Sequence, residues 1–227
     1  MKWLKRLLIA LLVLIFLSAV ITIILINPAS KKVLVDNIQS STGARVEIQK
    51  VNVGVLRANA SITGLTIFNK AEFGAGLFLE VKEFYTEYDR KLARNGSLRL
   101  KVLRLDIQTL VLVRNLDDQW NLPGIPQLAK LHRAGKSNEI PDRGIPFPKL
   151  AGKIFEGADV VDLSFNEIKI IDLGAEGKTA TVAVGLKNLR LENVNSPDDL
   201  RKKILPTLEK SLFMDRLADG ISTVIGP

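Results

Sequence analysis

The chain has 227 residues, of which 32 are Lys or Arg and 24 are Asp or Glu, giving a formal net charge of +8, and it contains no cysteine. The lack of cysteine excludes disulfides, thiolate metal sites and thiol catalysis. No dense Lys/Arg run with interleaved aromatic residues occurs, so we expect no nucleic-acid binding.

The N-terminal segment is strongly apolar, because only Ser18 and Thr22 interrupt the aliphatic run Leu7–Ile26. About 20 apolar residues in a helix span roughly 30 Å, the thickness of the hydrocarbon core of a bilayer. A secretory signal peptide has a shorter apolar core followed by a small-x-small cleavage site, and the residues after this longer core, Asn27–Lys32, make a poor one. We therefore predict an uncleaved transmembrane anchor at 7–26. The basic lead at 1–6 favours a cytoplasmic N-terminus, which places the remainder of the chain across the membrane.

The segment that follows changes from helical spacing to strand alternation. Residues 31–41, followed by Gly43, fit a short amphipathic helix. The apolar pattern then slips by one position at Lys50, which predicts a β-bulge there, and it slips again at Gly64. Alternating apolar residues predict strands over 45–55, 59–69, 77–88, 98–107 and 109–114. Polar turns separate these strands, so this part of the chain is predicted to be a β-meander.

The second half of the chain begins with a Pro- and Gly-rich segment at 135–148, which predicts an exposed loop. Strand patterns resume at 160–171 and 178–191. Residues 196–225 have the apolar spacing of an amphipathic helix, which Pro206 is expected to kink or split.

The predicted fold class is mostly β (α+β). It consists of a single N-terminal transmembrane helix followed by a curved antiparallel β-sheet or groove with flanking helices. The expected divisions are the lead (1–6), the anchor (7–26), a β-groove module (31–134), a flexible loop (135–148), further strands of the same sheet (149–195) and a C-terminal amphipathic helix (196–225).

Residues with chemical potential are sparse. The one histidine, His132, lies among cations beside the predicted loop, and no His/Asp/Glu cluster has the spacing of metal ligands. No nucleophile elbow, dinucleotide-binding or Walker pattern is present. The acidic pair at Asp117 and Asp118 lies in a turn-like segment. We therefore expect no enzyme, no catalytic residue, no cofactor and no metal.

The unusual feature is a large aliphatic surface spread over consecutive strands. These side chains could pack under the terminal helices as an ordinary core, or they could line an open trough for acyl chains. Each methylene buried in such a trough contributes about 0.8 kcal/mol, so lipid binding would need no specific polar contact. The candidate lipid-contacting residues are Val51, Val53, Val55, Ile62, Leu79, Val81, Leu100, Val102, Leu105 and Ile107.

A family resemblance is carried by five segments that follow the predicted anchor: Thr42–Ile48, Ala60–Asn69, Leu103–Ile107, Leu112–Asn115 and Trp120–Leu122. Their order resembles the N-terminal module of the AsmA-like proteins of bacterial envelopes, and the chain resembles a short member. The resemblance covers about the first 125 residues. The sequence departs from the family pattern in two places. Lys70 stands where the family often has Pro, and Gln119-Trp120 replaces the usual Gly before Asn121.

The resemblance implies a β-groove fold related to bridge-like lipid transfer proteins, with an anchor in the bacterial inner membrane and a periplasmic body. It supplies no catalytic residues. We therefore expect an inner-membrane-anchored periplasmic protein that binds or helps move phospholipid acyl chains and contributes to envelope lipid homeostasis. The expected partners are the membrane, phospholipid, and a second copy or a longer envelope protein. The alternative is an anchored scaffold or assembly factor that binds an envelope protein through a sheet edge.

Overall fold

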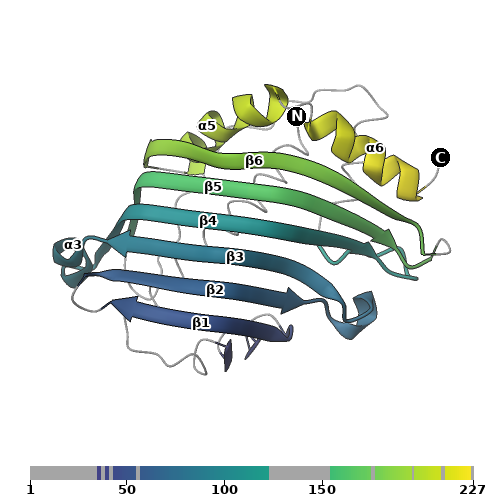
Figure 1. Cartoon of the computed structure of the whole chain (residues 1–227), viewed down its shortest axis with the longest axis horizontal. Coiled ribbons are helices and arrows are strands. Elements are labelled where there is room, and N and C mark those ends of the chain that lie inside the picture. The colour runs from purple at the N-terminus through teal and green to yellow at the C-terminus, as the bar shows by residue number, and fades with distance from the viewer. Residues whose placement is uncertain are drawn as a thin grey trace.

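The computed structural model of the chain describes residues 35–36, 39–40, 43–54, 57–122, 154–174, 177–195, 197–210 and 213–225. The described part is mostly β, as predicted, and consists of one six-stranded sheet with few helices (Figure 1). The strands lie in the sheet in chain order. Their bounds are β1 Val46–Gly54, β2 Asn59–Phe68, β3 Leu77–Tyr88, β4 Ser97–Arg114, β5 Ile154–Asp172 and β6 Thr179–Val194.

The sheet is mixed rather than wholly antiparallel. Strands β1 to β4 form the predicted meander, and β5 and β6 are also antiparallel, but β4 and β5 run parallel. A parallel pair needs a long connection that returns the chain to the end where the first strand began. The segment between Arg114 and Ile154 has that role. The two strands predicted at 98–107 and 109–114 are one continuous strand, β4.

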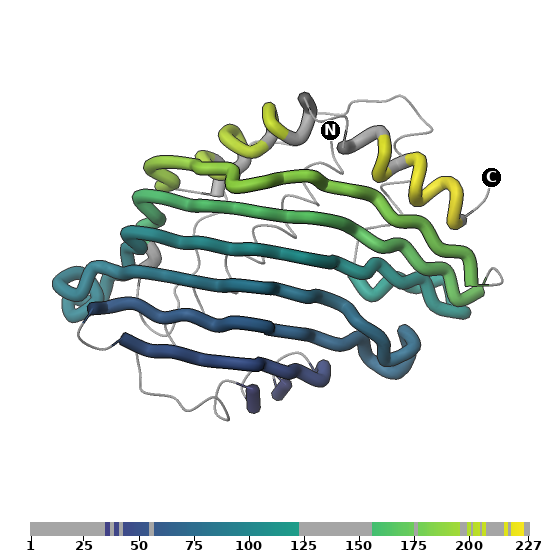
Figure 2. The backbone as a smooth tube through the Cα atoms, viewed as in Figure 1, coloured from purple at the N-terminus to yellow at the C-terminus, as the bar shows by residue number. Residues whose placement is uncertain are grey.

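The alternation of buried and exposed side chains shifts by one position in each of the first three strands, and the three shifts lie at the same level of the sheet. In β1 and β2 the slips fall around Gln49 and Gly64, and in β3 the slip lies between Val81 and Phe84. The β1–β2 register does not change across this level, so the bulge predicted at Lys50 is absent from that ladder. The shift in alternation is thus shared by all three strands, and Gly64 accommodates it with φ +63. The strands then follow one another along a shared curve (Figure 2).

Short helical connections join the strands of the meander. The 3₁₀-helix η1, Ala71–Phe73, links β2 to β3, and α3, Arg90–Arg94, links β3 to β4. The Asp89 carboxylate caps α3 by accepting hydrogen bonds from the backbone N–H groups of Lys91 and Leu92. These bonds, with that from Leu92 the stronger cause, hold the pKa of Asp89 below its ordinary value.

Two helices follow β6, namely α5, Pro197–Lys210, and α6, Phe213–Ile225. Pro206 lies inside α5, so it does not mark the division between the two helices. Both helices pack along the β6 side of the sheet, and α6 also contacts β5 (Figure 1). A Cβ atom on Gly220 of α6 would lie 2.7 Å from Cγ2 of Val182. The missing side chain therefore allows a close approach of α6 to β6.

Several predicted elements lie outside the described residues: the lead at 1–6, the anchor at 7–26 and the loop at 135–148. Of the helix predicted at 31–41, the structure describes Val35, Asp36, Gln39 and Ser40, and all four are helical. Within the described ranges, no helix combines the length and apolar character that a membrane span requires.

Candidate functional site: the apolar face of the sheet

One face of the sheet is almost entirely apolar. Residues paired across neighbouring strands lie on the same face, so the register traces continuous rows of side chains. One such row crosses all six strands and contains Val51, Ile62, Phe84, Leu105, Leu163 and Leu189. Phe84, Ile62 and Leu163 in this row are at most 1% exposed. This surface is called the apolar face below.

Eight of the ten candidate lipid-contacting residues lie on the apolar face. They are Val51, Val53, Ile62, Leu79, Val81, Leu100, Leu105 and Ile107. Val102 lies on the opposite face, because it pairs with Glu87 and Val160 while the adjacent Leu103 is fully buried on the apolar face. Strand β4 shifts its phase between Leu100 and Leu103, which reverses the side of Val102. Val55 lies outside the described residues.

The candidate residues in the interior strands are closed off from solvent. Leu79 and Val81 are 2% exposed, and Leu100 is 0% exposed. Val51 and Val53, on the edge strand β1, are only partly buried. Helices α5 and α6 pack on β5 and β6, whereas no extensive packing of a described helix against β1, β2 or β3 is found. The apolar face is therefore wider than the part that these two helices cover.

One fully buried hydroxyl interrupts the aliphatic character of the apolar face in the middle strands. Thr86 of β3 is 0% exposed and lies in register between Ala60 and Leu103, both of which are buried on this face. Its Oγ1 atom has no hydrogen-bond partner. An unpaired buried hydroxyl costs about 1–3 kcal/mol. The alternation of Phe84, Thr86 and Tyr88 would have placed Thr86 on this face, but our sequence analysis did not consider it.

One end of the sheet is held by side-chain amides. The Asn121 amide nitrogen donates to Oδ1 of Asn69 at 2.7 Å and to the Val111 carbonyl at 2.8 Å. Its oxygen accepts from the Val113 N–H at 2.9 Å. The Asn115 carboxamide oxygen closes the intervening turn by accepting from two backbone N–H groups. The three asparagines of the resemblance motifs therefore stabilise the fold at this end.

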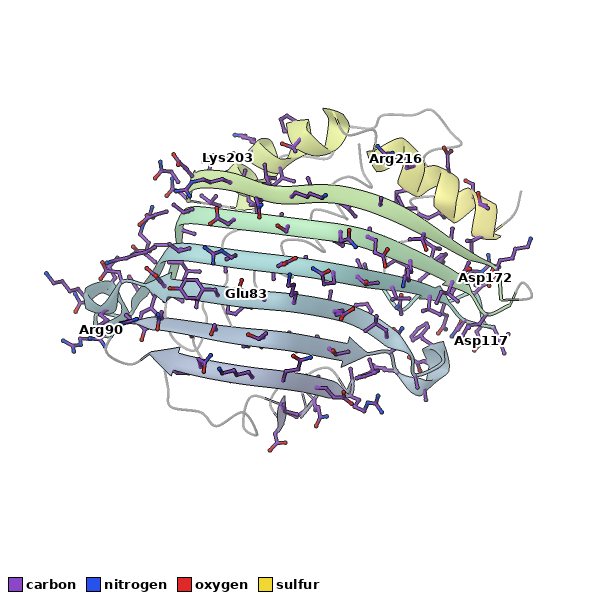
Figure 3. The ribbon with its side chains drawn as sticks, viewed as in Figure 1. Glu83, Arg90, Asp117, Asp172, Lys203 and Arg216 are labelled. Atoms are coloured by element: carbon purple, nitrogen blue, oxygen red, sulfur yellow. The ribbon has the colours of Figure 1, made fainter. Side chains whose placement is uncertain are left out.

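A buried ion pair lies at the same end. The Asp172 carboxylate is 0% exposed, and its Oδ2 lies 3.6 Å from Nη1 of Arg114. Oδ1 of Asp172 accepts from the Gly174 N–H at 2.9 Å. Arg114 also pairs with Asp118, whose side chain is 78% exposed. Figure 3 shows Asp172 at the end of the sheet opposite to Arg90 of α3. Asp172 is thus a buried charge that Arg114 compensates.

The opposite face of the sheet carries cross-strand ion pairs, although Val111 and Val113 of β4 are buried on it. Asp162 of β5 lies 4.0 Å from Arg104 of β4 and 3.9 Å from Arg190 of β6. The Tyr85 hydroxyl donates to the Glu87 carboxylate, and this hydrogen bond raises the pKa of Tyr85 above its ordinary value. Such partly exposed pairs contribute up to about 1 kcal/mol each. In the described part of the chain, no three His, Asp or Glu residues are grouped so as to hold a metal ion. Away from Val111 and Val113, this face has the character of a solvated surface.

Comparisons with known proteins identify no relative, because no family model, curated protein or solved structure matches this chain.

Proposed function

We propose that this chain is a membrane-anchored, AsmA-like protein that binds phospholipid acyl chains against the apolar face of strands β1 to β4. The observation that carries the proposal is the width of this face. It crosses the whole sheet, whereas the main contacts of α5 and α6 with the sheet are to β5 and β6. Acyl chains need a large aliphatic surface and few polar partners, and that is the composition of these strands.

The dimensions of the face also support acyl-chain binding. Leu79 and Thr86 lie seven positions apart on β3, a distance of about 24 Å at about 3.4 Å per residue. The hydrocarbon core of a bilayer is two acyl chains thick and measures about 30 Å, so one chain needs about 15 Å. The apolar face along β3 is therefore longer than one acyl chain. The side chains are buried in this structure, so binding requires the face to open.

The proposed location is the bacterial inner membrane, with the body in the periplasm. The support comes from the sequence, in which a basic lead precedes the apolar run at 7–26. An anchored body of this size would take up or deliver lipid at its own membrane and contribute to envelope lipid homeostasis.

Photo-crosslinking with diazirine-bearing methionine tests the proposal. Leu79→Met and Leu105→Met place the reactive group on the apolar face, and Leu-to-Met changes usually cost less than about 1.5 kcal/mol. Lys101→Met, on the exposed polar face, is the matched control. We expect phospholipid adducts in cells at positions 79 and 105 and none at 101. Cross-links confined to the protein's own peptides would show that the face is an ordinary closed core.

The alternative function, a scaffold that binds an envelope protein, rests on the edge strand β1. This strand pairs with β2 on one side, and no other described strand pairs with it. An unpaired edge can accept a strand from another chain. The same reagent at Asn52→Met, an exposed position of β1, would then give adducts to one envelope protein. Lipid adducts at Leu79→Met alone would favour lipid binding instead.

A further inference from the structure

The hydroxyl of Thr86 is the feature of the apolar face that aliphatic packing does not explain. A threonine at this position gains nothing from its oxygen, because Oγ1 is buried and has no partner. Valine has almost the same shape and no polar atom. The neighbours in register, Ala60 and Leu103, offer only apolar side chains. The residue two positions further along β3, Tyr88, is partly buried on the same face and carries a second hydroxyl.

We propose that Thr86 binds the ester carbonyl of a glycerolipid whose acyl chain lies along β3 towards Leu79. This inference rests on the proposed function and specifies how the lipid is oriented. The threonine O–H donates to the carbonyl oxygen, which satisfies the buried hydroxyl. An ester carbonyl is the polar group that directly adjoins the acyl chain in such a lipid. The polar headgroup then projects beyond Thr86, at the end of the sheet that carries α3.

The direction of the bound chain follows from the strand. From Thr86 towards Leu79 the apolar face presents Phe84 and Val81 on β3, and both are at most 2% exposed. The flanking strands contribute aliphatic side chains at each level, such as Ile62 of β2. In the other direction β3 ends at Tyr88, two residues beyond Thr86. Only the first direction offers about 15 Å of continuous apolar surface.

The test measures a preference between ester-linked and ether-linked lipid. The purified full chain in detergent, carrying diazirine-methionine at Leu79→Met, receives equal amounts of diester and diether phosphatidylcholine of the same chain length. Adducts at position 79 report only lipid on the apolar face, and their masses distinguish the two lipids. One hydrogen bond predicts about a five-fold preference for the ester. Thr86→Val should reduce the ratio to about one, and Thr86→Ser should restore it.

Thr63→Val is the matched control, because Thr63 is exposed on the polar face and this change should leave the ratio at about five. Thr86→Val should melt at the same temperature as the parent or higher, since it removes an unpaired polar atom. A large fall in its melting temperature would show that the hydroxyl is bonded within the fold and would overturn the inference.

The remaining outcomes separate this inference from the proposed function. Equal capture of both lipids with Thr86 intact, as expected if a bound water satisfies the hydroxyl, overturns the inference but leaves acyl-chain binding standing. A five-fold preference that persists in Thr86→Val also overturns it. If neither lipid forms an adduct at position 79, the proposed function fails and the inference fails with it.

Discussion

Replacing Asn121 by alanine should destabilise the fold. The side chain makes three hydrogen bonds, two donated to Asn69 and the Val111 carbonyl and one accepted from the Val113 N–H. Each contributes about 1 kcal/mol. Asn121 is partly exposed, so water can replace part of this loss. We expect a decrease in the free energy of unfolding of about 2–3 kcal/mol, and a melting temperature lower by about 5–10 °C.

Urea unfolding of the full chain in detergent, followed by circular dichroism, measures this loss. Asn52→Ala is the control, because Asn52 makes one exposed hydrogen bond of 3.5 Å to Ser61 and should cost less than about 0.5 kcal/mol. A double-mutant cycle with Asn69→Ala isolates the Asn69–Asn121 bond, for which we expect a coupling of about 1 kcal/mol. A cycle with no coupling, or equal losses for the Asn121 and Asn52 variants, would refute the structural role given to these amides.

Three further predictions concern other positions. Gly157→Ala would place a Cβ 2.1 Å from a backbone carbonyl of β6, so we expect the free energy of unfolding to fall by at least about 3 kcal/mol. Gly96 also has positive φ but no close neighbour, so Gly96→Ala should cost about 1 kcal/mol. Urea unfolding of the two variants measures the difference. Arg114→Met leaves the buried Asp172 charge uncompensated and should lower the free energy of unfolding by about 3–5 kcal/mol. The same change should cost much less in an Asp172→Asn background, and similar costs in both backgrounds would contradict the ion pair. Because the pKa of Asp89 is lowered, its hydrogen bonds to the N-terminus of α3 should persist as the pH falls past 3.8, the ordinary pKa of an aspartate, and be lost only at more acidic pH. Amide NMR signals of α3 that do not change when Asp89 is protonated would contradict this.

The positions and order of β1, β2 and β3 could be predicted because alternation is a local property, but the strands predicted at 98–107 and 109–114 are the single strand β4. The parallel pairing of β4 with β5 could not be predicted, since a strand alternates in the same way whichever direction its neighbour runs. The sequence also contains Val102 and Leu103 as adjacent apolar residues, and alternation alone does not decide which of them is buried. The change of phase in β4 decides it, and only the structure shows where that change occurs.

The candidate site was predictable as a surface but not in its details. The aliphatic residues of β2 and β3 were identified because they repeat every second position. The three asparagines of the resemblance motifs were identified by their pattern, but nothing in the sequence indicated that Asn69 and Asn121, from distant turns, bond to each other. Thr86 was missed because a lone threonine in a strand is usually solvent-facing, and its lack of a partner is visible only in the structure.

The parallel junction between β4 and β5 has a consequence for the order of folding. The β1–β4 meander closes through short turns, whereas joining β5 to β4 requires closing a connection of about 40 residues, which costs about 2 kcal/mol more in chain entropy than a four-residue turn. The β5–β6 hairpin, with α5 and α6 packed on it, is itself local. We therefore expect the two halves to fold locally and to meet late at the β4–β5 junction. Until the two halves meet, β4 and β5 each have an unpaired edge. A chaperone or a second copy of the chain would bind at these edges.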